Sequence, residues 1–280
     1  MNRLTSEQLI AGLQDLPSLP AVVMELLSSI DQENADISVL ARKVSYDQAL
    51  TAKTLRLANS PAFGAQVKVA TIQQAITFLG FQATRNLITA AALSGAFASG
   101  RCRGFDDRAF WRHSIATAAC ARALARRIRF NQDFAFTAGL LHDIGRLVLV
   151  TAQPDAYAEV LAWRARHGCE WREAEAAVLG LDHVDAGVAL AAHWQFSDTM
   201  RQAIAWHHAP HTPGAGSLAA IVHVADAIVH ALDLSGESDD VVPRLSGAAW
   251  DAMGLSEEAY LHLFRETETQ FSEMAAILLA

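Results

Sequence analysis

The sequence predicts an all-α protein built from two helical lobes. Apolar residues recur at the three- and four-residue spacing of amphipathic helices along most of the chain, and no segment shows the two-residue alternation that predicts a strand. Alanine and leucine are abundant, and aromatic residues make up only 8% of the sequence, as in helix-rich proteins. With 280 residues, the chain is long enough for one large domain or two modest ones.

The first lobe, residues 1–100, is expected to be an N-terminal bundle of five or six helices. A stiff connector at 15–20 contains two prolines, which fix φ and lack an amide donor. Aspartate or threonine precedes three of the later helices and can cap their free amide groups. The helices are expected at 5–14 and 21–30, after the caps Asp36 and Asp47, at 72–79 after the cap Thr71, and at 82–97.

The second lobe, residues 101–280, follows a predicted linker at 99–104 that combines two glycines, a serine and two arginines with no hydrophobic period. Its central segment, Asn131 to Val150, is expected to be one helix, in which Gly139 and Gly145 allow neighbouring helices to approach closely. The other helices are expected at 105–127, 155–167, 171–179, 184–194, 200–207, 218–234 and 256–280.

The formal net charge of −8 is distributed unevenly. Residues 1–100 are neutral, residues 101–130 carry +6 from eight arginines and two aspartates, and the remainder carries −14. The acidic total disfavours general binding to nucleic acid or other polyanions. The arginine-rich segment is either a local anion or partner site, or a solvated helix face that pairs with the acidic half.

The sequence predicts neither export nor membrane insertion. The first residues are polar and no hydrophobic signal region follows them. The longest apolar runs contain charges or histidines and fall short of the roughly 18 to 20 residues that a membrane span needs. Cys102, Cys120 and Cys169 form no Cys-x-x-Cys pair, which favours a reducing compartment. We therefore expect a cytoplasmic protein with no membrane span.

A histidine and an aspartate stand side by side in the apolar run Leu140–Leu147, where charge is costly unless it is paired or bound. On a helix, His142 and Asp143 would point about 100° apart, yet both can reach one ion above the helix. Histidine nitrogens and carboxylate oxygens are ordinary ligands of iron, manganese and zinc, so the doublet predicts a site for a divalent transition metal. Further ligand-type residues on the surrounding helices are His113, His183, His207, His208 and Asp226.

Each of these residues also has a structural interpretation. A lone histidine in an apolar helix is more often a hydrogen-bonded core residue than a ligand. Asp226 could instead pair with Arg146 as a structural clamp. His223 lies three residues before Asp226 on the same helix face, where it could support Asp226 as a ligand. We interpret the remaining histidines as ordinary hydrogen-bonded residues: His167, His193, His211, His230 and His262.

Several motifs in the chain are similar to those of one protein family. The sequence resembles the HDOD (HD-related output domain) family, within the HD superfamily of metal-dependent phosphohydrolases. The resemblance implies an all-helical, two-lobed protein of bacterial signalling with an HD-like C-terminal domain and no established enzymatic activity. The motifs are Leu16–Ala21, Leu55–Gly64, Ile72–Gly80, Phe110–Ser114, Ala138–Leu147, Leu179–His183 with Gly187, and Ile204–Pro210.

A neighbouring branch of that superfamily, HD-GYP, hydrolyses cyclic di-GMP at a two- or three-iron centre. The resemblance implies that the ligands of that centre correspond here to His113, His142, Asp143, His183, His207, His208 and Asp226. Two features depart from that branch. Arg146 replaces a lysine, and no Gly-Tyr-Pro motif follows the histidine pair at 207–208.

We therefore expect a signalling output module that acts through a protein partner without catalysis. One alternative is a metal-dependent phosphohydrolase or phosphodiesterase that acts on a nucleotide, a cyclic dinucleotide or another phosphate ester, with Arg146 clamping phosphate. A second alternative is DNA binding through a helix-turn-helix at residues 36–58, which the neutral charge of that lobe argues against.

Overall fold

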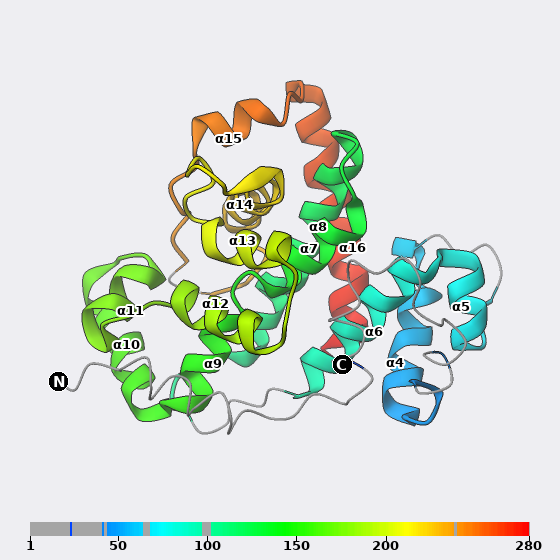
Figure 1. Cartoon of the computed structure of the whole chain (residues 1–280), viewed down its shortest axis with the longest axis horizontal. Helices are drawn as coiled ribbons and strands as arrows, with labels where there is room; N and C mark the ends of the chain where they lie inside the picture. The colour runs from blue at the N-terminus through cyan, green and yellow to red at the C-terminus, as the bar shows by residue number, and fades with distance from the viewer. Residues whose placement is uncertain are drawn as a thin grey trace.

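The structure is a computed structural model, and it describes residues 23, 41, 44–63, 68–96, 102–237 and 240–279 (Figure 1). The described residues form α-helices and one short 3₁₀ helix, with no strand among them, which confirms the all-α prediction. The helices are α4 (Gln48–Ala58), η1 (Pro61–Phe63), α5 (Ile72–Leu79), α6 (Phe81–Ala96), α7 (Asp107–Arg127), α8 (Gln132–Leu141), α9 (Ile144–Ala152), α10 (Pro154–His167), α11 (Trp171–Leu179), α12 (His183–His193), α13 (Asp198–Trp206), α14 (Gly216–Ala231), α15 (Gly247–Ala252) and α16 (Glu257–Leu278).

Local capping explains where several helices begin. Asp47 accepts a hydrogen bond from the amide of Leu50, and Thr71 accepts one from Gln74, so both predicted caps are confirmed. The expected helices at 5–14 and 21–30 and the cap at Asp36 lie outside the described residues, apart from single positions. The same holds for most of the linker at 99–104, so the division at residue 100 and the two-lobed arrangement stay predictions.

The two longest helices, α7 and α16, pack against each other near the centre of the molecule in Figure 1, and α7 also packs against α8 and α14. The C-terminal helix α16 also reaches the N-terminal helices α4 and α6. The lysine Nζ of Lys53 lies 3.4 Å from the carbonyl oxygen of Leu278, which joins the two ends of the described chain. The central core is therefore built by residues that are far apart in the sequence.

The expected single helix from Asn131 to Val150 is wrong in one respect, because it is broken at His142 and Asp143. His142 keeps helical dihedral angles, whereas Asp143 has φ −98° and ψ 11° and stands at the N-cap position of α9. Its carboxylate makes no capping hydrogen bond. The helix ends here because both side chains turn towards other polar groups, and tertiary contacts outweigh the helical preference of the apolar flanks.

Glycines bring the surrounding helices into close contact, as the sequence predicts. A Cβ atom at Gly139 would lie 2.8 Å from the carbonyl oxygen of Thr117 on α7. A Cβ atom at Gly145 would collide with the backbone of His183 on α12, and Gly187 faces Gly145 across the same crossing. These approaches hold α7, α8, α9 and α12 near the His142–Asp143 break.

Within the described residues, one apolar stretch, Gln132–Ala152, is long enough to cross a membrane by length and composition. However, 89% of its most apolar window is buried inside the molecule, as expected for the core of a helical domain. All three cysteines are free thiols, so the structure contains none of the disulfides that an oxidising compartment would favour.

Candidate metal centre

All seven predicted metal ligands converge at one place in the fold. They come from α7, from the break between α8 and α9, from the start of α12, from the turn after α13 and from α14. Six of them are buried and His208 is half-buried. The residues are His113, His142, Asp143, His183, His207, His208 and Asp226.

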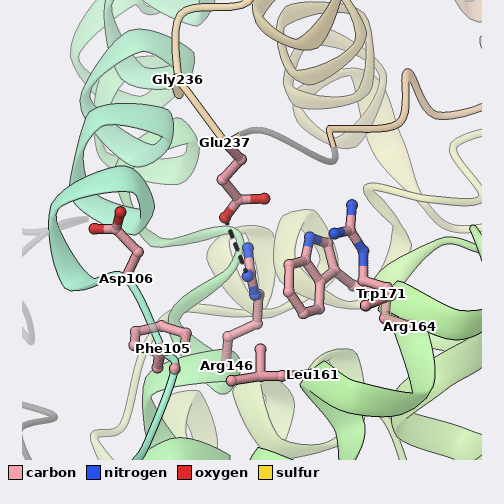
Figure 2. Close-up of a pocket in the computed structure, with 10 residues that line it drawn as sticks. Phe105, Asp106, Arg146, Leu161, Arg164, Trp171, Gly236 and Glu237 are labelled. Atoms are coloured by element: carbon pink, nitrogen blue, oxygen red, sulfur yellow. Dashed lines mark ion pairs between the residues drawn. The ribbon is translucent and has the colours of Figure 1, made fainter.

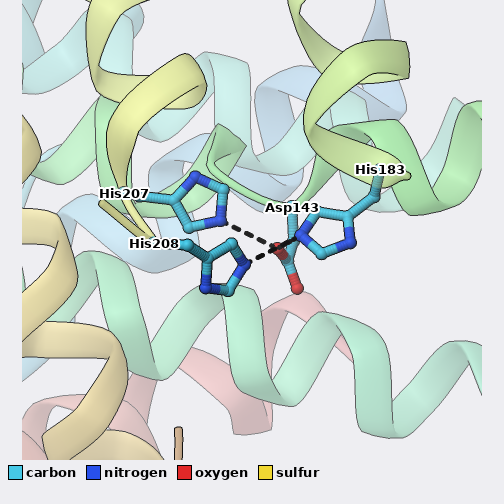
Figure 3. Close-up of side chains that lie close together, drawn as sticks. All are labelled: Asp143, His183, His207 and His208. Atoms are coloured by element: carbon cyan, nitrogen blue, oxygen red, sulfur yellow. Dashed lines mark hydrogen bonds and ion pairs between the residues drawn. The ribbon is translucent and has the colours of Figure 1, made fainter. Parts of the chain in front are cut away.

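The first group surrounds Asp143 (Figure 3). Its Oδ1 atom lies 3.3 Å from Nε2 of His183 and 3.5 Å from Nε2 of His207. Nε2 of His208 lies 3.0 Å from Nε2 of His183. One ligand atom from each of these four residues falls within 4.8 Å of the others, so this group could hold a metal ion.

The second group surrounds Asp226 on α14. Its Oδ1 atom lies 3.1 Å from Nε2 of His113 and 3.4 Å from Nε2 of His230. His142 lies between the two groups, since its Nε2 atom is 3.6 Å from the Oδ1 atoms of both Asp143 and Asp226. The cluster therefore contains two neighbouring sets of ligand atoms, and His142 at the helix break connects them.

His230 belongs to this second group, although the sequence placed it among the ordinary core histidines. It is half-buried, and its ring centroid lies 4.6 Å from that of His113. The available signal was its position four residues after Asp226, on the same face of a helix. Spacing alone could not distinguish it from a structural histidine.

Backbone carbonyls orient two of the rings. Nδ1 of His142 lies 2.7 Å from the carbonyl oxygen of Gly139, and Nδ1 of His207 lies 2.7 Å from that of Ile204. Because a carbonyl oxygen only accepts, each Nδ1 is the donor in the neutral ring, and each Nε2 lone pair is directed into the cluster. This is the tautomer that a metal ligand requires.

Carboxylates orient two other rings in the same way, one from buried Glu175 and one from half-buried Asp240. Oε2 of Glu175 lies 2.6 Å from Nδ1 of His183, and Oδ1 of Asp240 lies 2.6 Å from Nδ1 of His230. A carboxylate behind a histidine is a common support for a metal ligand, because it fixes the ring and raises its basicity. Neither Glu175 nor Asp240 was singled out in the sequence, since their roles depend on which helices meet.

The cluster holds its aspartates in the ionised form. Burial alone would raise the pKa of Asp143, but His142 and His183 hold it well below its usual range. Burial would also raise the pKa of Asp226, but His230 and other histidines hold it well below its usual range. Against the effect of burial, the carboxylates raise the pKa of His183 to about 9 and that of His230 to about 10. Burial lowers the pKa of three further rings, those of His113, His207 and His208.

Three buried polar atoms of the cluster residues lack a hydrogen bond of acceptable geometry: Nδ1 of His113, Nε2 of His207 and Oδ1 of Asp226. Leaving such atoms unsatisfied costs roughly 1–3 kcal/mol each, so their position calls for a partner. Imidazole nitrogens and carboxylate oxygens suit iron, manganese or zinc. The residues present therefore fit a divalent transition metal.

Neither of the two partners expected for Asp226, Arg146 and His223, is among its contacts in the described residues. Arg146 lies beside Asp143 instead, with 3.5 Å between Nη1 and Oδ2. Nδ1 of His223 donates to the carbonyl oxygen of His207, 2.7 Å away, and its Nε2 accepts from the amide of Ser246 at 2.9 Å. His223 therefore supports the backbone of a predicted ligand and does not pair with Asp226.

Two cavities adjoin this region. One reaches Asp143, His183 and His208, and its volume is about 30 Å³. The other is much larger, about 440 Å³, and is lined by Arg146 but by none of the seven predicted ligands (Figure 2). Arg164 and Trp171 contribute to the walls of both.

The sequence is similar to those of known proteins. The HDOD domain profile matches residues 16–210. An uncharacterized protein of Treponema pallidum (strain Nichols) is 26% identical over 206 residues, which are 72% of this chain and 39% of the relative. The chain thus spans about two fifths of the length of that curated relative.

Three solved structures are similar over most of the chain. An HDOD domain protein of unknown function from Geobacter sulfurreducens has a TM-score of 0.79 at 23% identity and covers 98% of each chain. A "Putative phosphohydrolase" from Shewanella amazonensis SB2B has a TM-score of 0.74 at 29% identity, over 97% of this chain and 98% of its own. The MmoQ response regulator of Methylococcus capsulatus has a TM-score of 0.51 at 28% identity, over 90% of this chain and 99% of its own.

The profile match covers well over half of the sequence and includes six of the seven predicted ligands: His113, His142, Asp143, His183, His207 and His208. It confirms the resemblance first seen in the motifs, and this protein belongs to the HDOD domain family.

Proposed function

We propose that this protein is a non-catalytic output module of bacterial signalling, in which the His/Asp cluster binds a divalent transition metal and stabilises the helices that meet there. The module acts through a protein partner in the reducing cytoplasm. The observation that carries the proposal is the contrast between a full set of ligand atoms and the small space that leads to them.

That space limits what can reach the cluster. A cavity of about 30 Å³ has the volume of roughly one water molecule. Sites for organic ligands are usually about 300–1,000 Å³. A phosphodiester does not fit between Asp143, His183 and His208 in this arrangement. The geometry therefore favours a bound metal that holds the fold over one that acts on a substrate.

The protein partner is supported by similarity to a response regulator and by membership of the HDOD family. Crosslinking the full chain in its native cell, followed by mass spectrometry, tests this part of the proposal. A second signalling protein is expected among the crosslinked products. Crosslinks that join only copies of this chain would contradict it.

Metal-dependent phosphoester hydrolysis is the second candidate. It is favoured by the complete ligand set, by Arg146 beside Asp143, and by the 29% identity to the Shewanella protein. A bound divalent metal would polarise a phosphoryl oxygen and lower the pKa of a coordinated water. Asp143 and the histidines would hold it, and Arg146 would stabilise negative charge on the phosphate.

A turnover assay separates the two candidates. Metal-supplemented protein is incubated with bis-p-nitrophenyl phosphate and with cyclic di-GMP, alongside the Asp143→Ala variant. Our proposal predicts that the wild-type protein and the variant give the same background rate. Turnover by the wild-type protein that disappears in the variant would overturn the non-catalytic assignment and support the hydrolase.

A further inference from the structure

The cavity of about 440 Å³ has two positively charged side chains on its wall (Figure 2). Two arginines line it, and both are almost completely buried, with 3% of Arg146 and 6% of Arg164 exposed. Both guanidinium groups lie over the ring of Trp171, each 4.0 Å from its centroid. The indole face favours cations and holds both side chains in place. The two arginines therefore place positive charge on this wall of the cavity.

A carboxylate of the protein itself faces this site. Oε1 of Glu237 lies 3.6 Å from Nη2 of Arg146, and Figure 2 shows it above the guanidinium group. Other ion pairs in the molecule are much closer, such as 2.6 Å between Arg172 and Asp182. The pair with Glu237 is thus a loose one, at a distance where a better anion can compete.

The second acidic residue on the cavity wall is already engaged. Oδ1 of Asp106 accepts a hydrogen bond of 2.9 Å from the amide of Ala109 and caps α7. Glu237 is therefore the acidic side chain of the wall that another anion can displace from Arg146. It lies on the segment that follows α14, outside any helix.

The remaining walls suit the organic part of a ligand. Phe105 and Leu161 present apolar surface to the cavity, next to the arginine pair. The volume falls within the range of about 300–1,000 Å³ that is usual for small-molecule sites. A phosphate monoester carries about −1.5 to −2 at pH 7, more than the single charge of a carboxylate. It can therefore displace Glu237 from Arg146.

From these contacts we propose that the cavity binds a small organic phosphate, held by Arg146 and Arg164 and bound in competition with Glu237. Arg146 would then report on the bound ligand, because Nη1 faces Asp143 at 3.5 Å while Nη2 faces Glu237. None of the seven predicted metal ligands lines the cavity, so the ligand is sensed and not hydrolysed. This site extends beyond the proposed function and does not depend on metal in the cluster.

Titration calorimetry of the full chain with AMP, inorganic phosphate and adenosine tests the site. AMP is expected to bind, inorganic phosphate to bind more weakly, and adenosine to bind at least about tenfold more weakly than AMP, since it lacks the charge that the arginines recognise. Arg164→Gln should weaken AMP binding about tenfold or more, and Glu237→Gln should strengthen it. Arg166→Gln is the matched control, because Arg166 is exposed on the same helix and lies outside the cavity.

Equal binding of AMP and adenosine, or no binding of AMP and phosphate to either the wild-type protein or Glu237→Gln, would overturn the proposal. The Glu237→Gln result remains decisive even where Arg164→Gln does not fold. Conversion of AMP to adenosine in the sample would also overturn it. Metal content is measured on the same samples, so that loss of the metal-binding function and loss of the phosphate site are told apart.

Discussion

The carbonyl oxygen of His183 packs directly against Gly145, so closely that a Cβ atom at Gly145 would collide with it. Gly145 lies two residues after Asp143, and His183 is the first residue of α12. The missing side chain therefore lets α9 and α12 approach closely enough for Asp143 and His183 to meet, with 3.3 Å between Oδ1 and Nε2. The same contact shapes the fold and the cluster.

Gly145→Ala is expected to destabilise the protein by about 3 kcal/mol, because backbone atoms on both helices would have to move apart. Urea unfolding measures the free energy, and metal content measured in parallel should fall. Gly247→Ala is the matched control, since a Cβ atom there meets nothing within 4 Å. Equal stability of the two variants would show that the crossing of α9 and α12 adapts without cost.

Glu175→Gln tests the support behind His183. Glu175 is fully buried and accepts hydrogen bonds from both the amide and the ring of His183 and from the hydroxyl of Tyr157. Removal of its charge lowers the basicity of the ring, and changes of this kind typically weaken metal binding by about 10- to 100-fold. Competition with a chelating dye measures the dissociation constant.

Glu173→Gln serves as the control for that variant, because Glu173 is exposed on the same helix, α11. Its metal affinity should match that of the wild-type protein. An unchanged affinity in Glu175→Gln would mean that Glu175 serves only the packing of Tyr157 and the start of α12.

Local rules account for much of what could be predicted from the sequence. The caps at Asp47 and Thr71 were predictable because each involves an amide only three residues away. Most helices followed from hydrophobic spacing, although the short α15 was missed. The seven ligand-type residues stood out because polar groups in apolar helices need partners.

Tertiary contacts decide what the sequence could not reveal. The break at His142 and Asp143 arises from side chains on α7, α12 and α14 and in the turn after α13, and no local signal opposes a continuous helix there. Glu175 and His183 lie eight residues apart, so only the meeting of α11 and α12 makes them partners. His230 could be recognised as a candidate ligand only from the position of His113, which lies on a different helix.

His230→Ala tests the second group of ligands. Loss of this ring removes one of the three residues in the group that contains Asp226, but none of the four in the group that contains Asp143. Metal bound near Asp226 should be lost, while metal near Asp143 stays, so the metal content per chain should fall without reaching zero. His193→Ala, at an exposed position, is the control and should leave it unchanged. The same metal content per chain in His230→Ala and His193→Ala would mean that His230 has only a structural role.

Cys120 provides a test of the core that does not involve the cluster. Burial raises the pKa of its thiol to about 12. A group whose pKa is higher in the folded state favours folding at low pH, and this contribution is lost as the pH rises from about 9 towards 12. The wild-type protein should therefore lose up to about 1.4 kcal/mol per pH unit over this range relative to Cys120→Ala. Urea unfolding at pH 8.5 and 10 measures the difference, and parallel losses in both proteins would contradict it.

The metal content of the protein tests the central claim most directly. Three proteins are purified without chelators: the wild-type chain, Asp143→Ala and the control Asp251→Ala. Inductively coupled plasma mass spectrometry measures their metal content, and circular dichroism confirms that they are folded. Asp251 is exposed on α15 and contacts none of the cluster. We predict iron, manganese or zinc in the wild-type protein and in Asp251→Ala, and a lower metal content in folded Asp143→Ala, which lacks the carboxylate of the first group. A wild-type protein without metal, or with the same content as Asp143→Ala, would contradict the account.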